Sequence, residues 1–386
     1  MLNSETHIQR SDKKISYYIS MKLESGEESA ARRAIYESQK NIDLPEGGMT
    51  KNQIMMLDIL ANNDWERPIY FTGGSYADSE YMWMKEYLQL EGLVYKLVPI
   101  RTPLNSNNPY IMGRLDSDLM YDIVMKWSWG NSESTSIYHD PETRKNSISF
   151  RSNMARLAEK LIEENKNEKA KNILDLAMEK MPLDYFGYYS LLVPFVDTYY
   201  RLEALSSAQS LAKKVAFKYR DELEYFASLT PSDQFMMGEE IITQIERYRT
   251  LVEAILIHED RELLKSELDL FTVSIEPFMN LYGDYDYYTS LTDFVEGYYL
   301  SGQKEEAEQL AESIVLQYEE RFGMIAKFSK SNKKRFFDRV KGEVLDFQEL
   351  IYRVELMGRA DFAASLQKRF DQSMEQFELE EDSLEN

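Results

Sequence analysis

The first part of the chain mixes two hydrophobic periodicities. Apolar and polar residues alternate from residue 15 to residue 23, and this period of two predicts a half-buried strand. Thr50 and Gln53 have the spacing of a capping box ahead of an apolar run, so a helix is expected to about residue 62. Short strands over 69–71 and 93–98, with a helix over 79–88 between them, complete the prediction of a small α/β unit over residues 1–114.

Residues 115–146 are predicted to join this unit to the rest of the chain. Asp116 precedes residues with helical spacing and is expected to cap a helix that runs to about Lys126. The loop after it contains Trp127-Ser128-Trp129 and then polar residues to about residue 146. We interpret this segment as a junction with a Trp-x-Trp loop.

From residue 147 onward, apolar positions recur with the 3.6-residue spacing of amphipathic helices. The segment Phe-Val-Asp-Thr-Tyr-Tyr at 195–200 recurs as Phe-Val-Glu-Gly-Tyr-Tyr at 294–299, and alanines follow each copy at the same distances. Small residues on one helix and large ones on its partner resemble the tetratricopeptide pattern. We therefore predict helical hairpins over residues 147–372 and an acidic disordered tail over 373–386.

The fold expected from these patterns is α+β and mostly α. A small N-terminal α/β unit is followed by a tetratricopeptide-like array of antiparallel helical hairpins. With 386 residues and a hydrophobic content of 43%, the chain is long enough for more than one domain and apolar enough to bury a core.

Charge and composition narrow the possible partners. A formal net charge of −22 argues against binding to nucleic acid and to anionic lipid, because both would repel such a surface. The absence of cysteine excludes disulfides, thiol nucleophiles and cysteine metal sites. No apolar run reaches about 18 residues, and residues 1–5 lack the features of a signal peptide. Any location outside the cytoplasm is therefore expected to depend on a segment that this sequence does not contain.

The sequence contains no pattern that indicates catalysis. His7, His139 and His258 are too far apart to have metal-type spacing, and there is no glycine-rich phosphate loop or serine nucleophile elbow. Adjacent carboxylates such as Glu163-Glu164 and Glu305-Glu306 are expected on solvated helix faces. We therefore predict no catalytic residue, no metal ligand and no cofactor.

Tyrosines offer one set of candidate binding residues. There are 27 of them, and clusters at 185–189 and 282–288 each precede a repeat unit. A tyrosine ring presents a flat apolar face and a hydroxyl, which suits contacts with glycans or peptides. We select Tyr188, Tyr285 and Tyr288 as candidates, while packing between the helices of the array is the favoured interpretation.

Residues in or beside the predicted loops offer a second set. Trp127, Trp129 and Asn131 form a loop that is suited to stacking on a sugar ring, and Trp65 with Arg67 lies ahead of Pro68. The alternative is that the tryptophans join the α/β unit to the helical array by burying their surface. We favour this junction interpretation, because tryptophan near a domain boundary usually buries a large area.

Two segments carry a family resemblance. Residues 63–71, Asn-Asp-Trp-Glu-Arg-Pro-Ile-Tyr-Phe, and residues 87–100, Tyr-Leu-Gln-Leu-Glu-Gly-Leu-Val-Tyr-Lys-Leu-Val-Pro-Ile, resemble the C-terminal soluble region of a family of bacterial multi-pass membrane proteins. That family has no assigned function and is related to protein O-mannosyltransferases of the GT-C type. The segment Lys-Trp-Ser-Trp-Gly-Asn at 126–131 and the helical repeats after it are similar to the same family.

The resemblance implies a role as part of a larger membrane protein. The acidic catalytic residue and the lipid-linked donor site of such proteins are expected in a transmembrane part that this sequence lacks. The chain would then be a non-catalytic extramembrane domain on the periplasmic face of the inner membrane. It would bind or position a protein or glycan acceptor, and it would reach the membrane through the missing N-terminal part.

Two alternatives remain open. The chain is a free-standing tetratricopeptide-like adaptor for peptides or proteins if no membrane segment accompanies it in the gene. A carbohydrate-processing enzyme with two catalytic carboxylates is the third hypothesis, although the sequence does not localise such a pair. The resemblance implies that the parent protein is a glycosyltransferase, whereas this chain itself is expected to have no enzymatic activity.

Overall fold

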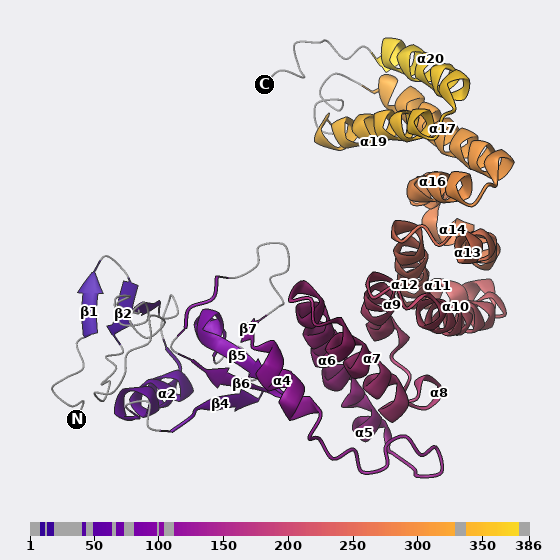
Figure 1. Cartoon of the computed structure of the whole chain (residues 1–386). Coiled ribbons are helices and arrows are strands. Elements are labelled where there is room, and N and C mark those ends of the chain that lie inside the picture. Colours follow the sequence, from indigo (N-terminus) through magenta and orange to yellow (C-terminus); the bar gives the residue numbers. More distant parts are fainter. Residues whose placement is uncertain are drawn as a thin grey trace. The chain divides into compact units, whose positions relative to one another are not determined.

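The computed structural model describes residues 8–11, 14–18, 41–43, 49–63, 67–72, 81–98, 100–103, 112–328 and 337–377. The chain forms two compact units, residues 1–191 and 192–386. The protein is mostly helical, with a small sheet in the first unit and a helical array after it, which confirms the predicted α+β, mostly α fold (Figure 1). The division into functional segments at residues 114, 146 and 372 stays a prediction.

In the described part of the first unit, short strands form a three-stranded sheet and a four-stranded sheet. β1 (Ile8–Ser11), β2 (Lys14–Tyr18) and β3 (Asn41–Asp43) form a three-stranded sheet in the order β1-β2-β3. β2 lies within the segment where alternating apolar and polar residues predicted a strand. In the second sheet, β4 (Tyr70–Thr72), β6 (Val94–Leu97) and β5 (Leu88–Glu91) pair in antiparallel fashion, and β7 (Arg114–Leu115) adds in parallel to β5.

The prediction of a helix over 79–88 was wrong at its C-terminal end. A 3-10 helix, η1 (Met82–Tyr87), ends where β5 begins, and β5 then turns back into β6 through Gly92 and Leu93. Gly92 has a φ of 69°, which glycine adopts without the steric cost that a side chain would add. The alternation Leu-Gln-Leu-Glu at 88–91 was the signal for this strand.

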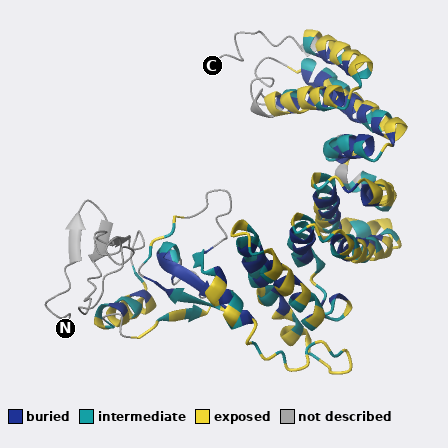
Figure 2. Ribbon diagram, viewed as in Figure 1, coloured by how far each residue is buried: buried dark blue, intermediate teal, exposed yellow. Residues whose placement is uncertain are grey.

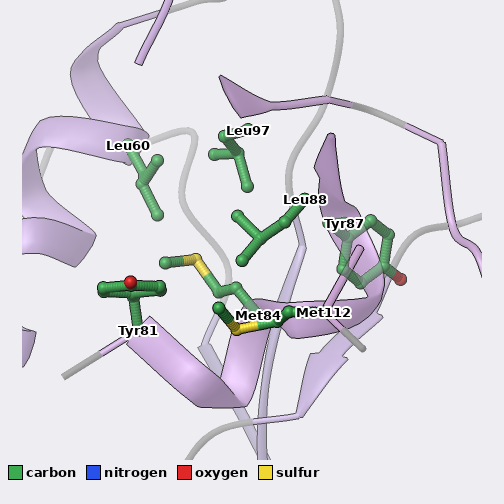
Figure 3. Packing of buried hydrophobic residues seen from close by; sticks show 7 residues of the cluster. All are labelled: Leu60, Tyr81, Met84, Tyr87, Leu88, Leu97 and Met112. Carbon is green, nitrogen blue, oxygen red and sulfur yellow. The ribbon is translucent and has the colours of Figure 1, made fainter. Parts of the chain in front are cut away.

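One apolar cluster holds the second sheet against a helix. α2 (Lys51–Asn62) begins with the predicted capping box, in which the Thr50 hydroxyl accepts from Gln53 N at 3.2 Å and Gln53 Oε1 accepts from Thr50 N at 2.9 Å. Its buried Leu60 faces side chains from η1, β5 and β6, which gather in Figure 3. The members of the cluster are Leu60, Tyr81, Met84, Tyr87, Leu88, Leu97 and Met112.

Gly113 allows β7 to lie beside β5. A Cβ atom at this position would lie 2.4 Å from the carbonyl oxygen of Leu88, and the φ of Gly113 is 69°. Every other residue would therefore force the two strands apart. The parallel pairing of β7 brings the start of the next helix to the edge of the sheet.

Helices complete the first unit. α4 (Ser117–Val124) is capped as predicted, because the Asp116 carboxylate accepts from Leu119 N at 3.1 Å. The other helices in the described part of this unit are α5 (Pro141–Lys145), α6 (Ser147–Glu163), α7 (Asn167–Lys180) and α8 (Leu183–Phe186), and η2 (Tyr189–Leu192) follows at its boundary.

The second unit is an array of helices. Figure 2 shows buried residues concentrated on particular faces of its long helices. The helices are α9 (Val193–Arg201), α10 (Leu205–Ala227), α11 (Pro231–Met236), α12 (Gly238–Ile257), α13 (Arg261–Ile275), η3 (Glu276–Phe278), α14 (Met279–Tyr282), α15 (Asp284–Thr289), α16 (Thr292–Leu300), α17 (Lys304–Ala326), α19 (Phe337–Leu356) and α20 (Ala360–Phe377). The repeat found in the sequence corresponds to α9–α10 and α16–α17, whose matching helices have 9 and 23 residues in both copies.

A recurring turn closes the hairpins α6–α7, α9–α10, α12–α13, α16–α17 and α19–α20. Three residues join the two helices in each, and the middle residue has a positive φ: Asn165 58°, Glu203 56°, Glu259 51°, Gly302 85° and Gly358 77°. Its N–H donates to the carbonyl three residues back, and the next N–H donates five residues back, as in Gly302 to Tyr299 at 3.0 Å and Gln303 to Tyr298 at 2.8 Å. This is the Schellman motif, which satisfies carbonyls at the end of the first helix.

Small residues and aromatic rings share the interior of the array. Ala208, Ala212, Ala307 and Ala311 are fully buried where the second helix of each repeat meets its neighbours. Aromatic rings fill the remaining space in a continuous series, with centroids 5.0–6.0 Å apart, through Tyr219, Tyr248, Phe271 and Phe294. The alanines thus permit close approach of the helices, while the rings fill the space between them.

A buried polar group links three helices of the array. Glu267 on α13 accepts from Arg220 of α10 at 2.6 Å and from the hydroxyl of Tyr248 of α12 at 2.9 Å. Only 3% of the Glu267 surface is exposed, and burial is the main reason that the pKa of Tyr248 is raised. Arg220 also donates to the Tyr248 hydroxyl at 2.8 Å, so all three groups bond to one another. Loss of Glu267 would leave the Arg220 charge without its carboxylate partner, which makes this group specific for the observed helix pairing.

The turns provide a matched test of backbone strain. Glu203 and Gly302 hold the same position in the two repeat copies, and a Cβ at Gly302 would meet open space. We expect Gly302→Ala to lower the free energy of unfolding by about 1 kcal/mol, and Glu203→Gly to raise it by a similar amount, since only glycine adopts positive φ without cost. Urea unfolding followed by circular dichroism at 222 nm measures both changes. Opposite signs in the two variants are required, and a loss of stability in both would contradict the explanation.

Candidate functional site

A polar cleft opens in the first unit between the end of the second sheet and the α6–α7 hairpin. Its volume is about 780 Å³, and its walls come from β7, the start of α4, α6 and the turn before α7. The parallel addition of β7 to β5 sets the position of Arg114 and of the Asp116 cap at one wall. Arg156, Lys160 and Glu164 form part of the opposite wall.

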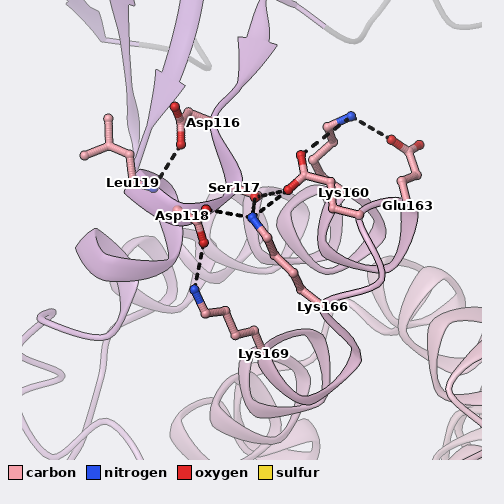
Figure 4. Close-up of polar contacts among 9 residues, drawn as sticks. Asp116, Ser117, Asp118, Leu119, Lys160, Glu163, Lys166 and Lys169 are labelled. Atoms are coloured by element: carbon pink, nitrogen blue, oxygen red, sulfur yellow. Dashed lines mark hydrogen bonds and ion pairs between the residues drawn. The ribbon is translucent and has the colours of Figure 1, made fainter.

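Ser117 lines this cleft and is at the centre of a charged network (Figure 4). Its hydroxyl donates to Glu164 at 2.5 Å and accepts from the ammonium group of Lys166 at 2.9 Å. Lys166 also pairs with Asp118 at 2.7 Å, and Lys169 pairs with the other oxygen of Asp118 at 2.7 Å. Because only 3% of Ser117 is exposed, the network connects α4 to the hairpin through a buried hydroxyl.

The electrostatics of this network favour structure over proton transfer. Hydrogen bonds from Lys166 and Lys169 lower the pKa of Asp118 to about 2. Hydrogen bonds from Lys166 and Ser117 lower the pKa of Glu164, and those to Asp118 and Glu164 raise the pKa of Lys166. Lys166 is therefore protonated at neutral pH and cannot act as a general base toward the Ser117 hydroxyl. These ion pairs and hydrogen bonds hold α4 against the α6–α7 hairpin.

The sequence identified only part of this network. Asp116 and Asp118 were recognised as features of a helix start, and Asp116 is the cap. Glu163 is exposed as expected and pairs with Lys160 at 2.9 Å. Glu164 is exposed as expected too, and it also bonds to Ser117 and Lys166. This bond was missed because Ser117 and Glu164 are 47 positions apart in sequence.

Trp127 and Trp129 lie together in the first unit, both half-buried. Their ring centroids are 5.6 Å apart, and both rings contact Phe150 of α6, at 5.0 Å and 5.5 Å respectively. Trp127 also covers the β5–β6 turn, since a Cβ at Gly92 would lie 3.4 Å from its ring. The two tryptophans therefore pack between the hairpin turn and α6, while their role in binding stays a prediction.

The other candidate residues belong to different segments of the chain. Asn131 is exposed and has a φ of 61°, and Arg67 is exposed in the segment before β4. Tyr188 has 39% of its surface exposed. Tyr288 belongs to the second unit, half-buried and in edge-to-face contact with Tyr287 at 5.1 Å. Trp65 and the side chain of Tyr285 lie outside the described residues.

Two further observations bear on the site. Within the residues that the structure describes, no group of three or more histidine or carboxylate side chains is arranged to hold a metal ion. In the same part of the chain, none of the helices combines the length and the apolar character needed to cross a bilayer.

One part of the chain matches a known family of domains. Residues 20–119 match the model of TMEM260-associated domain 2. The match includes the strands from β4 to β7 and ends in the first turn of α4, so it covers one wall of the polar cleft. It relates this part of the chain to a membrane-protein family. Neither the curated proteins nor the solved structures contain a match to the chain.

The tryptophan packing predicts an effect on stability. We expect Trp127→Ala or Trp129→Ala to lower the free energy of unfolding by about 1–3 kcal/mol, because each substitution removes a large half-buried ring from the contact with Phe150. Ser128→Ala, between them and exposed, is the control and should have almost no effect. Thermal unfolding of the three variants, with binding to a glycan array, separates the interpretations. Unchanged stability with lost glycan binding would contradict the packing role.

The charged network predicts acid sensitivity. The pKa of Asp118 is lowered from 3.8 to about 2, so its contribution to stability is complete above about pH 4 and is lost as the pH falls through about 2. Asp118→Asn should reduce the loss of stability over this range, whereas Asp122→Asn, on the exposed face of α4, should not. Tryptophan fluorescence reports this unit, because all four tryptophans lie in residues 1–191. Identical acid transitions for wild type and Asp118→Asn would contradict this assignment.

Proposed function

We propose that this chain is a non-catalytic extramembrane domain of a membrane protein related to GT-C protein O-mannosyltransferases, and that it binds or positions a protein or glycan acceptor. The match of residues 20–119 to TMEM260-associated domain 2 is the observation that carries the proposal. The family resemblance of residues 63–71 and 87–100 lies within the same range and points to the periplasmic face of a bacterial inner membrane.

The chemistry of the polar cleft supports binding in preference to catalysis. Its ion pairs hold Lys166 protonated, while Asp118 and Glu164 stay ionised. A general acid and a general base need pKa values near the operating pH, and these groups are shifted away from it. Such a site is suited to holding a polar ligand while the reaction takes place elsewhere.

The helical array supports the binding of a protein segment. The first helices of successive hairpins, α12, α16 and α19, contribute side chains to two clefts of about 330 Å³ and 510 Å³. Asp293 and Arg353 line both clefts, so the two openings adjoin. Carboxylates predominate around Arg353, and an acceptor segment with lysine or arginine side chains would complement them.

A free-standing adaptor is the second candidate, because the same clefts would serve it. The two proposals differ in membrane attachment. An adaptor would be released with the soluble proteins, whereas a domain of a multi-pass protein would stay with the membrane.

Fractionation of cells that carry the gene tests the proposal. With an antibody against residues 192–386, we expect the protein to stay in membranes washed with alkaline carbonate, and to be cleaved when protease is added to spheroplasts. An integral inner-membrane protein serves as the fractionation control, and a cytoplasmic protein as the control for intact spheroplasts. Recovery in the soluble fraction with protection from protease would contradict the membrane assignment and favour the adaptor.

A further inference from the structure

The two adjoining clefts of the helical array form a groove along α12, α16 and α19, here called the array groove. Asp293 and Arg353 line both of its parts. Among the described residues that line the groove there are eight carboxylates, and Arg353 is the single cation. Charge complementarity therefore favours a cationic ligand.

Apolar side chains form part of the same groove. Leu256 and Ile257 at the end of α12 and Leu300 at the end of α16 line the smaller cleft. Ile257 is 75% exposed, although isoleucine is usually buried. A ligand that fits this cleft needs an apolar group beside its cationic one, because contact with Ile257 then removes both apolar surfaces from water.

Arg353 already makes the contacts that the cation of a ligand would make. Its guanidinium donates to Asp293 of α16, and it lies 3.9 Å from a carboxylate oxygen of Glu296. It also pairs with Glu349 of its own helix at 2.7 Å. The side chains of Arg353 and Asp293 are 27% and 44% exposed, so water and salt screen their attraction and the pair contributes little to stability.

Release of Arg353 from Asp293 would leave its charge compensated. Glu349 lies one turn earlier on α19, at the i and i+4 spacing, so this ion pair can persist when Arg353 turns away from α16. The carboxylates of Asp293 and Glu296 would then be open to another cation. Exchange of one cation for another therefore costs less than the removal of Arg353 would suggest.

The carboxylates near this contact favour an added positive charge. Burial raises the pKa of Glu253 on α12, and the charge of Asp293 contributes, although Arg249 pairs with Glu253 at 3.2 Å. Burial and the charge of Glu349 raise the pKa of Asp346. Raised carboxylate pKa values mean that the surroundings disfavour negative charge, and a bound cation would offset this cost.

We propose that Arg353 is an internal competitor in the array groove, and that the partner is a protein segment in which a lysine or arginine adjoins an apolar residue. The cation of the segment displaces Arg353 from Asp293 and Glu296, and the apolar side chain packs on Ile257 and Leu300. This role of Arg353 rests on the proposed function, in which the array binds an acceptor segment.

Fluorescence anisotropy of a short labelled peptide of alternating lysine and leucine tests this role, with the full chain at low ionic strength. We expect Arg353→Gln to bind the peptide roughly fivefold more tightly than wild type, because the competing cation is gone. Peptides with serine in place of leucine, or glutamate in place of lysine, should bind more weakly to both proteins. Arg369→Gln is the matched control and should bind like wild type, since Arg369 of α20 pairs with Glu319 of α17 outside the groove.

Several outcomes would overturn the proposal: no peptide binding by wild type and Arg353→Gln, an affinity of Arg353→Gln no higher than that of wild type, equal tightening by Arg369→Gln, or equal binding of the three peptides. Ile257→Ser decides the case if Arg353→Gln does not fold. It changes an exposed side chain and should weaken peptide binding at an unchanged thermal midpoint, so unchanged binding would contradict the apolar contact.

The fractionation experiment separates this proposal from the proposed function. Retention in carbonate-washed membranes without peptide binding would reject the role of Arg353 and the segment chemistry alone. Release with the soluble proteins would reject the membrane assignment, whatever the peptides do.

Discussion

A left-handed residue in the middle of a three-residue turn is the constraint on which the helical hairpins depend. In all five turns of the described hairpins, this residue lets the chain reverse while the carbonyls of the preceding helix stay hydrogen-bonded. A turn this short holds the two helices antiparallel and fixes which residues meet. The alanines at 208, 212, 307 and 311 then lie where the helices approach closely. The turn geometry therefore helps to set where each buried ring lies, together with the tendency of aromatic side chains to be buried.

The same constraint explains where the polar surfaces arise. Once short turns place the helices of a pair side by side, the first helices of neighbouring pairs share a face, and this face holds Asp293 and Arg353. In the first unit, the turn at Asn165 brings Glu164 and Lys166 against Ser117. Binding surfaces therefore form at hairpin ends and along hairpin faces, where the packing of the interior does not decide which side chain is present.

Local signals in the sequence predicted local structure well. Two helix starts were predicted from capping residues, Thr50 with Gln53 and Asp116. Each cap bonds to a residue only three positions away, so the signal is local. The repeat at 195–200 and 294–299 gave the array. The strand at 88–91 was missed, since its alternation is short and follows a helical segment. Glu203 and Glu259 gave no turn signal, because glutamate rarely adopts positive φ. The bonds of Ser117 to Glu164 and Lys166 gave no signal, because these residues are 47 and 49 positions apart in sequence.

The matching hairpins α9–α10 and α16–α17 have a consequence for the evolution of the array. The hydrogen bonds of each turn lie within its own hairpin, and the buried rings of a hairpin contact those of adjacent helices. Folding stability therefore depends on contacts between neighbours along the array. A gene segment encoding whole hairpins can then be duplicated or lost while the remaining contacts stay intact. The identical helix lengths of the two copies, with α12–α13 between them, are the pattern that duplication of such a segment would leave. Relatives with longer or shorter arrays can therefore share one architecture, and the number of hairpins sets how much surface each presents.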